Sequence, residues 1–262
     1  MSGVRVGIIA TVMLASVALA QKLDVAIGGQ FAKEIEREYR VLPDPAVTDY
    51  ATRLAARIAQ SAGMNAPVTV KVLENSQVHA FDFPGGLLYI TTGLIARAET
   101  EAELADVLAH EIGHLKLNNG YHSPRRNADG RAMGRWFLGC SRWTLNSAVP
   151  LASLTEFRNI EQETDTAAIE YLQTAGYDPL GMLEFYNKLR YEEPRLAQTW
   201  SSHDLMELHS YVEESVAPNP EFIVNTAAFD AIRKRFLPGP KRPPSLAERP
   251  TLTRVNSPLA VR

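Results

Sequence analysis

The stretch TEAELADVLAHEIGHLKL, residues 100–117, decides the fold of this chain. Thr100, followed three residues later by Glu103, forms a capping box, a pattern that begins many helices. Behind it, apolar residues recur on one face at helical spacing, at Leu104, Leu108, Ile112 and Leu115. Asn118-Asn119-Gly120 then interrupts the pattern. The sequence therefore predicts a helix that begins after Thr100 and stops at Asn118.

The predicted helix carries the pattern His110-Glu111-Ile112-Gly113-His114. Positions i and i+4 lie on one helical face, so both imidazoles can reach one Zn²⁺ at about 2.0–2.1 Å. Glu111 lies one step round the helix, where it can hold a metal-bound water instead of the metal. A carboxylate or another histidine must supply the third ligand, which leaves a fourth position open for water. We therefore expect one zinc ion per chain.

Two acidic residues downstream have a spacing that fits this requirement. Glu161 and Asp165 lie four residues apart in RNIEQETDTAAIEYL, residues 158–172, on a second predicted helix. One carboxylate can bind the metal while the other orients a ligand imidazole through its second nitrogen. Taken alone, such an acidic cluster is typical of a solvated face. Beside an HExxH helix, it favours a metal site.

The remaining pattern predicts one α+β domain. Helical spacing covers residues 23–39, 44–58, 154–173 and 178–190. Extended segments are expected at residues 68–73, 78–83 and 87–92, with Pro84-Gly85-Gly86 as the turn between the last two. The result is a small sheet among helices.

With these elements in place, the chain resembles the zinc peptidases that include the CAAX prenyl proteases and their soluble bacterial relatives of the HtpX, BepA and Oma type. The resemblance runs from about residue 27 to residue 186 and rests on FDFPGGLLYITTGLI, ETEAELADVLAHEIGH and the downstream Glu-x-x-x-Asp. It implies an α+β, mainly helical, zincin-like metallopeptidase domain with a small β-sheet beside the HExxH helix. It also implies roles for single residues: His110, His114 and Glu161 as zinc ligands, Glu111 as catalytic base, and Asp165 as partner of a ligand. Glu163 is the competing third ligand.

Three segments depart from the family pattern. The family usually has Asn-Ala-Phe before the Pro-Gly-Gly turn, and this chain has His79-Ala80-Phe81. Thr164 stands where an alanine usually precedes the aspartate. A Ser-Thr-His-Pro segment of relatives corresponds here to Ser201-Ser202-His203-Asp204, so His203 is a candidate donor to the developing oxyanion. We expect the strand that contains His79, Ala80 and Phe81 to hold an extended substrate by edge pairing.

These features predict a zinc-dependent endopeptidase in which Glu111 activates a zinc-bound water. Its expected partners are unfolded or misassembled polypeptides of the cell envelope, which implies a role in protein quality control. Two alternatives stay open. One is a chaperone-like assembly factor with a latent zinc site. The other is a purely structural zinc, which fits less well because structural sites usually close all four positions with Cys or His.

Composition and the two ends of the chain indicate an exported protein. The 262 residues carry a net charge of −3 at a pI near 6.1, which gives no reason to expect a nucleic-acid partner. Arg5, an apolar stretch over residues 6–19 and a small-x-small site predict a signal peptide at residues 1–20 and a periplasmic or extracellular location. An uncleaved N-terminal membrane anchor is the alternative.

The expected catalytic domain spans residues 21–237, and residues 238–262 form a proline-rich tail that we expect to be extended or disordered. Cys140 is the only cysteine, so an intramolecular disulfide is excluded. For residues 121–153, three roles stay open: a lid over the site, peripheral contact with a membrane, or simple packing.

Overall fold

The computed structural model describes residues 22–117, 151–192, 205–217 and 219–237. The expected signal peptide, the proline-rich tail, Cys140 and His203 lie outside the described residues, as do residues 121–150 of the segment with three open roles. Within the described residues the chain is mainly helical with one small sheet, as predicted.

The sheet has three strands, β1 (Thr69–Leu73), β2 (Ala80–Phe83) and β3 (Leu87–Thr91), in the order β1-β3-β2. The central strand β3 pairs antiparallel with β2 and parallel with β1. Gly85 and Gly86 in the predicted turn have φ values of 84° and 81°, a region that other residues rarely adopt. The turn therefore needs glycine at both positions, and it leaves β2 at one edge of the sheet.

Local signals in the sequence account for the ends of the long helices. α2 (Pro45–Ser61) begins at Asp44, whose carboxylate accepts hydrogen bonds from two backbone amides of the first turn. α4 (Glu101–Leu117) begins at the predicted capping box: Thr100 Oγ1 accepts from the Glu103 amide at 3.3 Å. The Glu103 carboxylate accepts from the amide of Glu99, one residue earlier than a standard capping box. α6 (Leu151–Ala175) ends at Gly176, with φ 80°, and α7 (Leu180–Glu192) follows.

Three shorter helices were not predicted from the sequence pattern. α3 (Thr92–Arg97) directly follows β3, and α9 (Leu205–Ser215) and α10 (Ala227–Arg233) lie after α7. The side chain of Thr91 caps α3, and that of Thr226 caps α10. A single capping threonine is too common in loops to predict a helix without an apolar pattern behind it.

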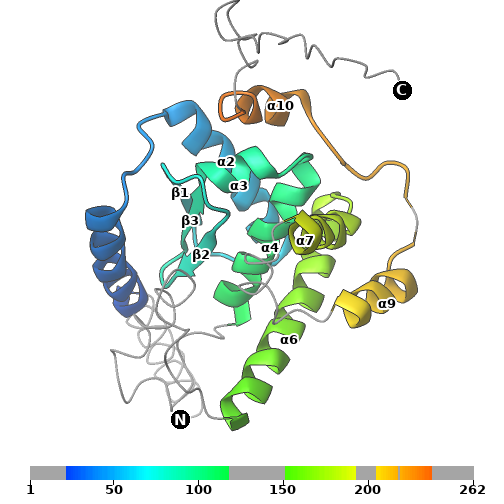
Figure 1. Cartoon of the computed structure of the whole chain (residues 1–262). Helices are drawn as coiled ribbons and strands as arrows, with labels where there is room; N and C mark the ends of the chain where they lie inside the picture. The colour runs from blue at the N-terminus through cyan, green and yellow to red at the C-terminus, as the bar shows by residue number, and fades with distance from the viewer. Residues whose placement is uncertain (1–21, 118–150, 193–204, 218, 238–262) are drawn as a thin grey trace, which may run out of the picture.

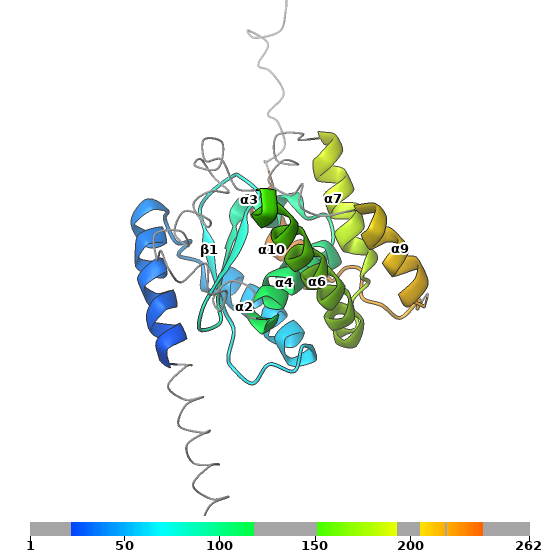
Figure 2. The ribbon, with the colours of Figure 1, turned by 90° about the horizontal axis from the view of Figure 1, so that it is seen from below.

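The elements form layers around α4 (Figures 1 and 2). The N-terminal helix, residues 22–38, covers one face of the sheet, where Ala32 and Ile35 pack with Leu73, Phe83 and Tyr89. The other face joins the main core, in which α4 packs against α2, α6, α7 and β2. Every residue from Glu101 to Leu115 is buried as a result. The sequence predicted one apolar face, whereas α4 is enclosed on all sides and carries its polar residues into the interior.

None of the helices in the described ranges is both long and apolar enough to cross a membrane.

Candidate metal centre

The close crossing of α4 and α6 builds the site. Gly113 faces Thr164 at this crossing, and a Cβ atom on Gly113 would come within 2.8 Å of the Thr164 methyl group. Because glycine leaves this space free, α6 approaches α4 closely and brings Glu161 opposite the two histidines. All three side chains are buried, with relative exposures of 3% for His110, 7% for His114 and 8% for Glu161.

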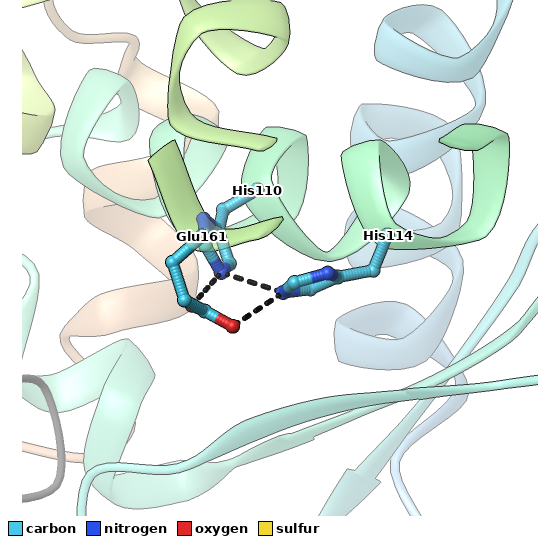
Figure 3. A group of neighbouring side chains, drawn as sticks. All are labelled: His110, His114 and Glu161. Carbon is cyan, nitrogen blue, oxygen red and sulfur yellow. Dashed lines mark hydrogen bonds and ion pairs between the residues drawn. The ribbon is translucent and has the colours of Figure 1, made fainter. Parts of the chain in front are cut away.

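Three potential ligand atoms converge at this point (Figure 3). The two Nε2 atoms of His110 and His114 are 2.9 Å apart. Glu161 completes a triangle, with Oε2 at 3.5 Å from His110 Nε2 and Oε1 at 3.7 Å from His114 Nε2. Zinc bonds of about 2.0–2.1 Å in a tetrahedron place neighbouring ligand atoms roughly 3.3–3.4 Å apart. The triangle is therefore of the size and donor type that suit zinc.

This cluster is distinct within the structure. Among the residues that the structure describes, no other group of three His, Cys, Asp or Glu side chains meets the spacing for a metal ion. Glu163, the competing third ligand, is exposed on α6 and is not part of the cluster. His209 is also exposed and lies 3.4 Å from Glu213, on α9.

Residues of α6 also hold the outer nitrogens of the two imidazoles. Asp165 Oδ1 lies 2.8 Å from His110 Nδ1, and Thr164 Oγ1 lies 3.3 Å from His114 Nδ1. Burial works to lower the pKa of His110, but hydrogen bonds to Asp165 and Glu161 outweigh it and raise that pKa well above its usual range. Without metal, the two carboxylates therefore favour the protonated form of His110, with which a metal ion would compete.

Glu111 lies in the wall of the same site, on the side of β2. Its carboxyl group accepts a hydrogen bond from the backbone N–H of Asp82 and is buried, with 7% relative exposure. Burial, helped by the nearby charges of Asp82 and Glu161 and opposed by that of His110, raises the pKa of Glu111 to about 8. A carboxyl group with a pKa near neutrality is suited to proton transfer.

Two further residues belong to the site's surroundings, and sequence reasoning missed both. Tyr186 on α7 is buried, and burial together with the charges of Asp165, Glu161 and Glu111 raises its pKa well above the usual range. Asp82 on β2 is likewise buried, with 3% relative exposure. No spacing rule connects either residue to the HExxH helix, because each comes from an element whose position depends on the tertiary fold.

The strand residues predicted to bind substrate have different surroundings. Ala80 packs against the core on the α4 side of the sheet, whereas Phe81 packs with Phe83 and Tyr89 on the opposite side. The backbone amide and carbonyl of His79 face Thr91, and its ring lies 3.3 Å from the Gln77 side chain. Burial lowers the pKa of His79. Of these three residues, Ala80 is the one on the side of the sheet that faces the metal centre.

A helix with two histidines one turn apart, a carboxylate opposite them on a second helix and a buried acid beside them define a metallopeptidase domain of the HExxH class. The model of peptidase family M48 matches residues 45–214, well over half of the chain, and the chain belongs to that family. The matched region contains every element of the metal centre.

Curated relatives agree with this assignment. The beta-barrel assembly-enhancing protease of Yersinia pestis is 27% identical over 184 residues, which cover 63% of this chain and 37% of that protein. The protein of the same name from Escherichia coli strain K12 is 26% identical over 181 residues, with the same coverage of 63% and 37%. The mitochondrial metalloendopeptidase OMA1 of Arabidopsis thaliana is 31% identical over 129 residues, 46% of this chain and 25% of that protein. The similarity therefore spans between a quarter and a little more than a third of the length of these relatives.

Proposed function

We propose that this chain is a zinc-dependent endopeptidase whose metal ligands are His110, His114 and Glu161. The observation that carries the proposal is the triangle of ligand atoms, with sides of 2.9, 3.5 and 3.7 Å, beside a buried Glu111. Three protein ligands with a fourth position for water are the pattern of a catalytic rather than a structural zinc site. Two imidazoles and a carboxylate are also a donor set of catalytic zinc sites.

When bound there, zinc supplies a Lewis acid and a position at which water becomes acidic near neutral pH. Its charge also favours the ionised form of Glu111, whose pKa without metal is raised to about 8. As a carboxylate, Glu111 takes a proton from the attacking water while a new C–O bond forms at the peptide carbonyl. It then passes this proton to the nitrogen as the C–N bond breaks. His203 stays a candidate donor to the oxyanion and lies outside the described residues.

The edge of β2 supports binding of an extended polypeptide. The carbonyl of His79 accepts a hydrogen bond from the amide of Thr91, and Phe81 is paired with Tyr89 on β3. Backbone groups alternate along an antiparallel strand, so those of Ala80 and Asp82 point to the outer edge. The Asp82 amide binds Glu111, which leaves the backbone of Ala80 to pair with a substrate next to the catalytic base. A flexible or unfolded segment can adopt this extended form more easily than a compact fold can.

We further propose that the protein is exported and acts on envelope polypeptides. The support comes from the signal-peptide pattern at residues 1–20 and from relatives named beta-barrel assembly-enhancing protease. An uncleaved N-terminal anchor would also place the catalytic domain outside the cytoplasm.

Cleavage of casein by the zinc-loaded protein tests the proposal, with Glu111→Gln as the matched variant. Both proteins should hold one zinc, and only the wild type should cut, because glutamine cannot accept the proton. If both hold zinc and neither cuts, the endopeptidase proposal fails for unfolded substrates in general, and the assembly factor with a latent site replaces it. Equal cleavage by both proteins would contradict the role of Glu111.

A further inference from the structure

We infer that Thr164 is a positioning residue for the metal centre: its hydroxyl oxygen accepts the Nδ1 proton of His114 and thereby presents Nε2 to the metal. This inference rests on the proposed role of His114 as a ligand. Thr164 then serves His114 as Asp165, the next residue on α6, serves His110.

The hydrogen bonds of Thr164 determine which role its hydroxyl plays. Its Oγ1 lies 2.8 Å from the carbonyl oxygen of Ile160, one turn earlier on α6. A carbonyl oxygen can only accept, so the single hydroxyl proton points to Ile160. The lone pairs of Oγ1 then face His114 Nδ1, at 3.3 Å. For this contact to be a hydrogen bond, the His114 ring must carry its proton on Nδ1.

The contact that His114 makes through Nε2 is consistent with a proton on Nδ1. His114 Nε2 lies 2.9 Å from His110 Nε2, a contact that needs one donor and one acceptor. With its proton on Nδ1, His114 uses the lone pair of Nε2 as the acceptor in this contact, and Nε2 is the atom that would bind a metal. A ligating imidazole commonly has its other nitrogen fixed by a hydrogen bond, which orients the ring.

Packing at the helix crossing explains why threonine suits this position. The side chain is completely buried, with 0% relative exposure. Its methyl group fills the space over Gly113, where a Cβ would come within 2.8 Å of it. The methyl contact and the bond to Ile160 together fix the side-chain rotamer, so the hydroxyl oxygen stays beside His114. Alanine, the usual family residue, cannot make this contact.

Zinc affinity of the full chain, measured by competition with a chelator, tests the inference. Thr164→Val keeps the branched shape but replaces the hydroxyl with a methyl group, so we expect zinc binding about tenfold weaker. This is the lower end of the range for outer-sphere partners, because a 3.3 Å hydrogen bond is long. Thr164→Ser keeps the hydroxyl and should bind zinc within about threefold of wild type.

Thr166→Val is the matched control. Thr166 lies on the same helix and makes the same kind of bond, from Oγ1 to the Gln162 carbonyl at 2.9 Å, but it is not part of the cluster. Its replacement should leave zinc affinity unchanged. Equal losses in Thr164→Val and Thr166→Val would assign the effect to the helix and overturn the inference.

Nitrogen NMR of the zinc-loaded protein with ¹⁵N-labelled histidine gives a second readout that does not depend on activity. The His114 ring should show a proton on Nδ1 and metal on Nε2, and Thr164→Val should shift the Nδ1 signal while Thr166→Val leaves it in place. Metal on Nδ1, or an unmoved signal, would overturn the inference. If the proposed role of His114 as a ligand is wrong, His114→Ala should bind zinc as tightly as wild type. That result would distinguish failure of the proposed metal site from failure of the inference about Thr164.

Discussion

The carboxyl group of Glu111 is buried beside a second acidic residue, Asp82, and burial raises its pKa to about 8 from the ordinary value of 4.5. The folded protein thus holds this proton more tightly than the unfolded chain does. As the pH rises from about 4.5 to 8, the free energy of unfolding of the metal-free protein must fall through this group. The residue that we propose as catalytic base therefore lowers the stability of the metal-free protein.

Glu111→Gln should remove this cost, because the amide has no charge to bury. We expect the metal-free variant to be more stable than metal-free wild type at pH 8, by on the order of 4 kcal/mol, and similar to it near pH 4.5. Urea unfolding of both proteins at the two pH values measures the difference. An equal loss of stability with pH in both would show that Glu111 is not the group responsible.

Glu161 and Glu163, two residues apart, are the two candidates for the third metal ligand. Glu161 is buried in the cluster, whereas Glu163 is exposed on the same helix. Glu161→Gln should weaken zinc binding by more than the roughly 10–100-fold that loss of an outer-sphere partner costs, and Glu163→Gln should leave it unchanged. Metal titration of the two variants decides between them. A loss confined to Glu163→Gln would reassign the ligand.

At the scale of elements, the crossing of α4 and α6 depends on a missing side chain. A Cβ on Gly113 would lie 2.8 Å from the Thr164 methyl group and 3.2 Å from its carbonyl oxygen. Gly113→Ala should therefore lower the free energy of unfolding by about 1–3 kcal/mol, although alanine favours helix more than glycine does. Gly29 in the N-terminal helix has nothing within 4 Å of its Cβ position and gives the control.

In the control, Gly29→Ala should raise the free energy of unfolding by about 0.5–1 kcal/mol, since only helix propensity changes there. Chemical denaturation of both variants compares the two positions. If Gly113→Ala stabilised the protein, the crossing of α4 and α6 would have room for a Cβ at this position. Close helix packing would then not explain the glycine in the HExxH motif.

The edge of β2 gives the second prediction about an element. Ala80→Pro removes an outward N–H without removing a bond to β3, so the sheet should survive while substrate pairing is lost. We expect the KM for an unfolded substrate to rise about tenfold with little change in zinc content, which corresponds to about 1.4 kcal/mol, the size of one hydrogen bond. An unchanged KM in a folded variant would exclude pairing at this edge.

Elements could be predicted from sequence where the signal is local. α4, α6 and the strands follow from capping residues, spacing and the Pro-Gly-Gly turn, and the four-residue spacing pointed to Glu161 and Asp165. Pairing could not be predicted: β3 runs parallel to β1, and the order β1-β3-β2 places β1 and β2 at opposite edges of the sheet, which no strand pattern encodes. For the same reason the sequence did not reveal that Tyr186 and Asp82 lie beside the site, or that Thr164 contacts His114.

At the scale of the whole molecule, the metal centre joins otherwise separate parts of the chain. Its proposed ligands come from α4 and α6, their outer partners from α6, and Glu111 accepts a hydrogen bond from β2. A bound metal therefore links the central helix α4 to α6, which packs directly against it (Figure 1). Because a metal that binds only the folded chain stabilises it, zinc at 100 times its Kd should add about 2.7 kcal/mol.

This stabilisation should depend on pH in a defined direction. Hydrogen bonds to Asp165 and Glu161 raise the pKa of His110 well above its usual range, against the effect of burial, so the metal-free site carries a proton that zinc must release. Raising the pH makes the proton easier to displace, and the difference in Tm between zinc-loaded and chelator-treated protein should be larger at pH 8 than at pH 6. Thermal unfolding at both pH values, at one free zinc concentration, measures it.

Calorimetry provides the direct check on this coupling. Zinc binding measured near neutral pH in two buffers with different ionisation enthalpies should report more than one proton released per zinc, from His110 and in part from Glu111, whose metal-free pKa is about 8. His110→Ala tests the first source, because it removes the imidazole that holds one of these protons, and with it that part of the release and most of the zinc affinity. Proton release that persists at the same level in this variant would show that His110 does not hold a displaced proton.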